Sequence, residues 1–439
     1  VRRGGDGAAE WFSSDTRHDD PGLETRKHTP LPPLIVGGGG WRVGVRFRLA
    51  PTPTQEQALL EHCAHARFVW NLAVEQHAHW RPGRASAPGY AKQSRQLTEA
   101  RREFAWLAAG SHTVQQQALR DLAQAMANLF AGTHRGPTWR KAGRHEGFRI
   151  VGKRGNQWDV RRVSRKSGAV RIPKVGWVRF RWTRTVPDEV KSFRVNRDGA
   201  GRWHVSFAVI PPPIGRPDTG EIVGVDRGVA VSAALSTGEL LMVPGLREGE
   251  AKRLLRLQRR LARAKRNSNR RKRVKAALGR LRTRETDRRK DWVEKTSTDL
   301  ARRFDRIRVE DLKIRNMVRS ARGTVQIPGK NVRAKASLNR SIHAAGWGLL
   351  VTRLENKAPG RVERIDPAFT SQICNTCGYC ASESRESQAV FCCRTCGHTD
   401  HADVNAAKNI AVGRTVTARG GWPLGGPVNR EPQPVFSSV

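Results

Sequence analysis

Residues 223–230 read VGVDRGVA, and this stretch decides how the second half of the chain is expected to fold. The apolar run through Val225 predicts a short buried strand, which Asp226 closes. The residues after it alternate up to a Ser-Thr-Gly turn at 236–238, so they predict a hairpin. An isolated Asp at a strand end is more often a cap or a turn residue than a catalytic group. Asp226 therefore indicates a catalytic site only if other acids converge on it.

Two further acids stand at comparable positions. Glu310 ends a predicted buried strand, and Asp403 directly precedes a predicted helix at 404–410. Three carboxylates at such positions could converge on divalent metal. Two hard cations about 4 Å apart can activate water and stabilise the leaving oxygen in phosphodiester hydrolysis. Each acid alone is weak evidence, and Asp311 or Asp400 could be the working group instead.

Four cysteines form two Cys-x-x-C pairs, and a glycine follows each pair. Four thiolates can surround zinc tetrahedrally, and glycine permits the tight turn that each pair needs. Because the protein would fill every coordination position, the zinc is expected to be structural. Cys380 and Cys392 lie nearby and could each replace a neighbour, but we expect them to be spare thiols. The predicted zinc ligands are Cys374, Cys377, Cys393 and Cys396.

The charge of the chain is extreme. Its 439 residues include 81 Lys and Arg against 39 Asp and Glu, which gives a formal charge of +42. Such a body repels itself unless a polyanion neutralises it, and nucleic acid is the commonest polyanion in a cell. A solvated basic tail is the alternative, but the basic residues run through the whole sequence. Nucleic acid is therefore the expected partner.

No membrane partner is expected. No run of about 18 apolar residues predicts a membrane span, and the first residues do not resemble a signal peptide. We therefore expect a cytoplasmic protein. Six of the seven cysteines fall between Cys374 and Cys396, which in a reducing compartment indicates metal ligation rather than disulfides.

The first half of the chain predicts a small β-barrel or sheet that a helical segment interrupts. Thr54 and Gln57 resemble a capping box at the start of that helical segment, which extends to about residue 132. Alternating apolar residues predict strands at 43–49, 178–182 and 203–209, with a turn at 196–199 between the last two.

The second half predicts two long basic helices joined near residues 267–269. Their density of Arg and Lys favours contact with a polyanion over a merely solvated face. Residues 315–336 are aperiodic and predict a mobile loop, and a helix carrying Trp347 follows.

Longer segments then occur in a fixed order along the chain. They are RFRLAPTPTQEQ at 46–57, ARFVWN at 66–71, VGVDRGVA at 223–230, SNRRKRVKAALGRLRTRETDRRKDWVEKTSTDLARRFD at 268–305, VEDLKIRNM at 309–317, LNRSIHAAGWGLL at 338–350, TSQICNTCG at 370–378, FCCRTCG at 391–397 and DHADVNAAKNI at 400–410. This set closely resembles the TnpB (OrfB) proteins of bacterial and archaeal insertion sequences.

The resemblance implies an RNA-guided DNA endonuclease. Such proteins bind a guide RNA transcribed from the transposon end and cleave matching double-stranded DNA beside a transposon-adjacent motif. Matched motif by motif, the three catalytic positions fall on Asp226, Glu310 and Asp403. The resemblance implies that these residues hold two Mg2+ ions, as in RuvC nucleases. Asp400 becomes a helper or a cap. The resemblance also assigns the structural Zn2+ to the four cysteines predicted above, and it places the protein in a prokaryote, at the nucleoid when bound to DNA.

The implied fold is an α+β and α/β multidomain protein. It has an N-terminal wedge β-barrel with an inserted helical domain, then an RNase H-like (RuvC) domain with an inserted zinc ribbon. The expected boundaries are a disordered leader 1–40, wedge barrel 41–53 and 133–213, helical insertion 54–132, RuvC-like nuclease 214–368 with a basic hairpin 250–303, zinc ribbon 369–398, final RuvC segment 399–412 and disordered tail 413–439. Alternative functions are a DDE-type transposase, whose acid order differs, and a non-catalytic RNA- or DNA-binding regulator, against which the complete set of acids argues.

Overall fold

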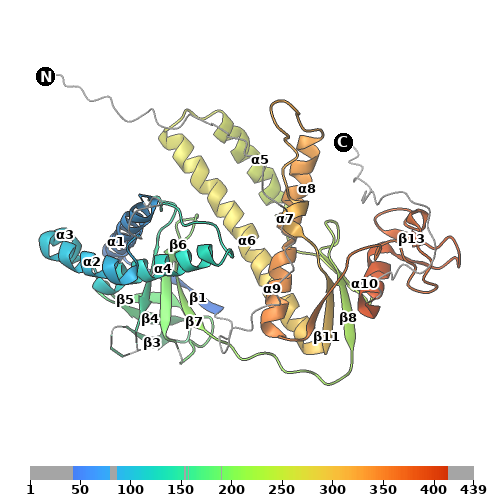
Figure 1. Cartoon of the computed structure of the whole chain (residues 1–439), viewed down its shortest axis with the longest axis horizontal. Coiled ribbons are helices and arrows are strands. Elements are labelled where there is room, and N and C mark those ends of the chain that lie inside the picture. The colour runs from blue at the N-terminus through green and yellow to red at the C-terminus, as the bar shows by residue number, and fades with distance from the viewer. Residues whose placement is uncertain (1–42, 80–86, 153–154, 157, 189, 414–439) are drawn as a thin grey trace, which may run out of the picture. The chain divides into compact units, whose positions relative to one another are not determined.

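A computed structural model describes residues 43–79, 87–152, 155–156, 158–188 and 190–413, and combines helices with antiparallel and mixed sheets (Figure 1). The predicted leader 1–40 and nearly all of the predicted tail lie outside the described residues. Within the described residues, no helix is long and apolar enough to cross a membrane.

The first sheet has seven antiparallel strands in the order β2-β6-β7-β1-β5-β4-β3. Its buried aromatic side chains pack together, with the Phe47 and Phe180 ring centroids 5.0 Å apart. The turn predicted at 196–199 is shifted, because Asn196 and Arg197 are the last residues of β6, a strand that was not predicted, and the turn to β7 begins at Asp198. The strands are β1 Val43–Ala50, β2 Gly147–Val151, β3 Asp159–Ser164, β4 Ser167–Ile172, β5 Gly176–Arg181, β6 Ser192–Arg197 and β7 Trp203–Val209.

Among the described residues, four helices lie between β1 and β2. They are α1 Pro53–Ala78, α2 Tyr90–Glu103, α3 Ala105–Ala109 and α4 His112–Phe130. The capping box was predicted two residues too late. Thr52 is the N-cap, its side chain accepts from the backbone of Gln55, and the Gln55 side chain accepts from the backbone of Thr52. Pro53 explains the difference, because proline is favoured at the first helical position.

The second sheet has five strands in the order β10-β9-β8-β11-β12. The central strand β8 runs parallel to β11, which runs parallel to β12, and β9 is antiparallel to β8. The predicted hairpin is confirmed, although its second strand begins only at Ala233. The strands are β8 Ile222–Asp226, β9 Ala233–Leu235, β10 Leu240–Leu241, β11 Arg306–Glu310 and β12 Val362–Ile365.

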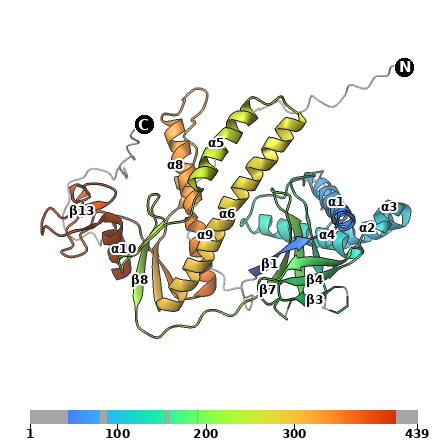
Figure 2. The same ribbon diagram turned by 180° about the vertical axis from the view of Figure 1, so that it is seen from behind.

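Helices surround the second sheet, and α10 lies beside β8 in both views (Figures 1 and 2). Leu257, Val274 and Leu281 form the apolar seam of the predicted basic hairpin. The loop predicted at 315–336 is wrong at both ends, because residues 315–317 belong to the four-residue helix α7 and residues 332–336 are the start of the 14-residue helix α8. The helices are α5 Glu248–Ala262, α6 Asn269–Arg303, α7 Ile314–Met317, α8 Val332–Ala345, α9 Trp347–Lys357 and α10 Ala402–Val412.

Candidate active site and cysteine cluster

Asp226 and Glu310 meet at one edge of the second sheet. Val225 pairs in parallel with Val309, so the next residue of each strand reaches the same edge. Val225 and Val309 are almost fully buried, which fixes the register because a slip by one residue would turn these side chains outward.

Asp403 reaches the same place through α10, which packs directly on β8. Gly224 makes this approach possible. A Cβ atom at that position would lie 1.9 Å from the carbonyl oxygen of Ala407 and 2.4 Å from the backbone nitrogen of Ala411. Only glycine therefore fits here, and the first turn of α10 brings Asp403 to the end of β8.

The three carboxylates influence one another electrostatically. Loss of water raises the pKa of Asp226 well above its usual range, and the negative charges of Glu310 and Asp403 raise it further. Arg385 opposes this shift. Glu310 and Asp403 are themselves only 8% and 7% exposed. Such a surplus of confined negative charge fits divalent cations, whose binding would neutralise it.

Three side chains that the sequence did not single out hold these acids. Thr370 donates its hydroxyl to Oε1 of Glu310 over 2.7 Å, and Arg385 donates Nη2 to Oδ1 of Asp403 over 2.9 Å. The buried Arg227 donates to the backbone carbonyl of Glu310 and so ties the end of β8 to the end of β11. Thr370 begins the segment 370–378 that resembles TnpB proteins, but its position there predicts no role, and no motif contains Arg385; each residue contacts an acid that is distant in sequence.

The two alternative acids are engaged elsewhere. Asp400 accepts from Lys408 over 2.7 Å, and Asp311 forms ion pairs with Lys313 and Arg364. This geometry supports Asp403 over Asp400 as the third member of the site.

The four predicted cysteines also come together. Their sulfur atoms all lie within 4.8 Å of one another, and no other group of at least three His, Cys, Asp or Glu ligand atoms in the described part of the chain is as close. The carboxylate oxygens of Asp226, Glu310 and Asp403 therefore lie farther from one another than the four sulfur atoms do. Cys380 and Cys392 stay outside the cysteine group.

Each cysteine pair lies in the same kind of turn. The backbone nitrogen of Gly378 donates to Cys374, and that of Gly397 donates to Cys393. Both glycines have positive φ, at 78° and 71°, which favours glycine. The backbone N–H of Cys396 lowers the pKa of the Cys393 thiol to about 6. Against a backbone hydrogen bond from His398, the neighbouring cysteine sulfurs raise the pKa of the Cys396 thiol to about 12, so metal binding must displace the proton of that thiol.

Helix α10 connects the cysteine cluster to the acids. Asn405 donates to the carbonyl of Ile373 over 2.7 Å and accepts from the backbone of Asn375 over 3.0 Å. Asn409 donates to the carbonyls of Thr370 and Ile373. The segment that enters the first cysteine turn is thus fixed to the helix that carries Asp403. Strands β13 (Val390–Cys392) and β14 (Thr399–His401) pair beside the second turn.

The fold is similar to one in a solved Cas12f1 complex. The match is to the protein in a "Cas12f1-sgRNA-target DNA complex", with a TM-score of 0.53, 14% identity and coverage of 82% of both chains.

Protein-family profiles give the more particular identification. They are described as "Probable transposase" over residues 204–321, "Cas12f1-like, TNB domain" over 347–410 and "Helix-turn-helix domain" over 42–83. Within the described residues, the segment that matches the helix-turn-helix profile consists of β1 and α1.

Two relatives match most of the chain. "Putative RNA-guided DNA endonuclease InsQ" of Escherichia coli (strain K12) is 35% identical over 90% of this chain and 98% of its own length. A protein of Streptomyces pristinaespiralis, "Putative RNA-guided DNA endonuclease", is 31% identical over 85% of this chain and 90% of its own length. The chain belongs to the TnpB (OrfB) family, as its motifs predicted.

Proposed function

We propose that this chain is an RNA-guided DNA endonuclease encoded by an insertion sequence. The observation that carries the proposal is the meeting of Asp226, Glu310 and Asp403 at one sheet edge in a member of this family. The names of the relatives and the charge of +42 support nucleic-acid partners. The guide would be transcribed from the transposon end, and the target would be double-stranded DNA beside a transposon-adjacent motif.

In this proposal Asp226, Glu310 and Asp403 hold Mg2+. The bound ions would supply an activated water and stabilise the leaving oxygen of a phosphodiester. Thr370 orients the Glu310 carboxylate by its hydrogen bond, and Arg227 holds the strand end from which Glu310 projects. Arg385 offsets part of the negative charge, and we assign it the contact with the phosphate that approaches these acids.

We assign structural Zn2+ to Cys374, Cys377, Cys393 and Cys396. Four protein thiolates leave no position open for substrate, and the binding free energy of the metal then contributes to folding. Because Asn405 and Asn409 fix the neighbouring backbone to α10, a filled cysteine cluster would also support the position of Asp403. The wedge barrel, the inserted ribbon, the predicted domain boundaries and association with the nucleoid belong to this proposal.

The test uses protein co-expressed with its own transposon end. Asp226→Asn, Glu310→Gln and Asp403→Asn should each abolish cleavage of matched DNA in magnesium, yet bind that DNA normally in chelator. Affinity comes from basic residues and guide pairing, whereas these carboxylates hold the metal.

Asp400→Asn is the matched control and should retain most of the activity, since Asp400 pairs with Lys408 instead. Cleavage by all four variants would refute the assignment of the site. If Asp400→Asn is inactive and Asp403→Asn is active, the third catalytic residue is Asp400 and not Asp403.

A further inference from the structure

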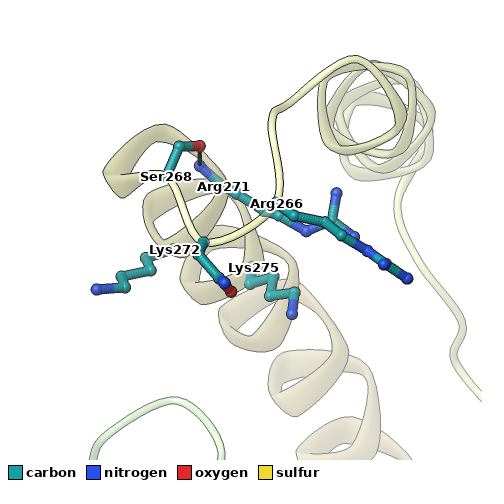
Figure 3. Close-up of a pocket in the computed structure, with 6 residues that line it drawn as sticks. Arg266, Ser268, Arg271, Lys272 and Lys275 are labelled. Atoms are coloured by element: carbon teal, nitrogen blue, oxygen red, sulfur yellow. Dashed lines mark hydrogen bonds between the residues drawn. The ribbon is translucent and has the colours of Figure 1, made fainter. Parts of the chain in front are cut away.

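The turn between α5 and α6 forms a cavity of about 460 Å3 (Figure 3). It lies at the end of the basic hairpin, and nothing in the proposed nuclease chemistry uses it. We call it the hairpin-tip cavity. Its lining residues are Arg266, Asn267, Ser268, Arg271, Lys272 and Lys275.

Internal hydrogen bonds fix the shape of this turn. The Ser268 hydroxyl accepts from the backbone of Arg271 over 3.2 Å and donates to the carbonyl of Lys265 over 2.8 Å. The Arg271 side chain donates to the carbonyls of Leu261 and Ala264 at the end of α5. Arg271 therefore closes the turn, while the cavity is preformed and needs no ligand to shape it.

For the other basic side chains of the cavity, no hydrogen bond that closes the turn is found among the described residues. Arg266, Lys272 and Lys275 are exposed, and no carboxylate pairs with any of the three among the described residues. Between Glu250 and Glu285 the sequence contains sixteen Lys and Arg and no Asp or Glu. Repulsion among so many like charges is costly unless an anion is present.

The remainder of the hairpin is different. Near its other end, Glu250 pairs with Arg288 and Arg284, and Glu285 pairs with Arg282 and Arg289. Positive charge is therefore neutralised within the protein at one end and left unpaired at the tip. A uniformly solvated helix surface would not require this division.

We propose that the hairpin-tip cavity binds consecutive phosphates of a nucleic-acid backbone. Figure 3 shows Lys272 extending to one side of the turn and Arg266 to the other, so the charges do not converge on one point. Such a spread suits successive phosphates along a strand better than one free phosphate ion. The inference rests on the proposed function in taking nucleic acid as the partner, and RNA and DNA share the chemistry that it requires.

The first test compares two triple variants of the full chain in chelator. One removes the cavity charges with Arg266→Gln, Lys272→Gln and Lys275→Gln. The matched control removes three exposed charges of α5 outside the cavity, with Arg253→Gln, Arg256→Gln and Arg260→Gln. The probes are a fluorescent RNA and a DNA duplex, each of about 30 nucleotides per strand.

We expect the cavity variant to weaken binding of at least one probe about tenfold at roughly 0.15 M salt, and to reduce the salt slope by about two. The control should change the affinity less than about threefold. The affected probe identifies the source of the phosphates, and added inorganic phosphate should not displace it. Equal effects of the two triple variants, or no effect on either probe, would overturn the proposal.

A second measurement needs no variant. Bound RNA or DNA should protect Lys272 and Lys275 of the wild-type chain from acetylation, read by mass spectrometry. Lys290 lies exposed on the same helix outside the cavity and should stay reactive. Uniform protection of all three lysines would contradict a discrete site. Because chelator prevents cleavage, failure of the nuclease assignment would leave this result intact, and the two outcomes can be distinguished.

Discussion

Replacing Gly224 by alanine should displace Asp403 from Asp226 without altering either carboxylate. The new Cβ atom would lie 1.9 Å from the Ala407 oxygen, whereas ordinary contact begins at 3.4 Å, so α10 must retreat by roughly 1.5 Å. The opposing atoms belong to backbone and cannot rotate away. Overpacking of this kind costs about 1–3 kcal/mol of unfolding free energy. A shift of about 1 Å at reacting groups can lower the rate about 100-fold.

The assay is guided cleavage in saturating magnesium, measured beside urea unfolding and zinc content. Gly249→Ala is the matched control, because a Cβ there meets no atom within 4 Å. Gly249 lies in the first turn of α5, so alanine should preserve cleavage and could stabilise the helix by about 0.5–1 kcal/mol. If Gly224→Ala cleaves within about twofold of wild type at an unchanged urea midpoint, α10 does not position Asp403 as argued here.

Three further predictions concern the two candidate metal sites. Cys374→Ser should lose zinc and unfold at a lower urea concentration, because metal binding is coupled to folding. Cys380→Ser should keep the zinc content and the urea midpoint of the wild type. Equal zinc contents in the two variants would contradict the ligand assignment. The raised pKa of Asp226 means that the folded state disfavours its ionised form, so the metal-free protein should lose stability as pH rises through that pKa, and Asp226→Asn should remove this loss. Metal requires the ionised form, so the magnesium concentration for half-maximal cleavage should fall over the same pH range; independence from pH would show that Asp226 is ionised throughout. Arg385→Gln should lower cleavage about 100-fold, whereas Arg394→Gln, which removes an exposed arginine paired with Glu386, should have little effect; equal losses would refute a specific role for Arg385.

The sequence predicted those features that depend on neighbouring residues. The strand that ends in Asp226 has a short apolar run, the strand that ends in Glu310 alternates Ile307 and Val309 with arginines, and the cysteine turns have fixed spacing with a following glycine. Even the misplaced capping box was recoverable. Thr52 and Thr54 each precede a glutamine by three residues, and Pro53 at the first helical position decides in favour of Thr52.

Strand β3 shows why other elements were missed. Of its six residues only Val160 is buried, and the residues from Arg161 onward are exposed. Without a buried face there is no alternation to detect, since hydrogen bonds to β4 rather than apolar burial define this edge strand. Thr370 and Arg385 were missed for a related reason. Their contacts with Glu310 and Asp403 join segments whose proximity only the folded chain creates.

The distribution of charge explains how one chain can have separate sites suited to a polyanion and to cations. Although the protein carries +42, Asp226 still has a raised pKa, because burial and two neighbouring carboxylates outweigh the opposing charge of Arg385. The surplus of positive charge therefore does not neutralise the site. Much of it lies on exposed surfaces such as the tip of the α5–α6 hairpin, where it can meet phosphates. The confined negative charge is thereby left for metal, and the same fold can bring a phosphodiester to the ions that would cleave it.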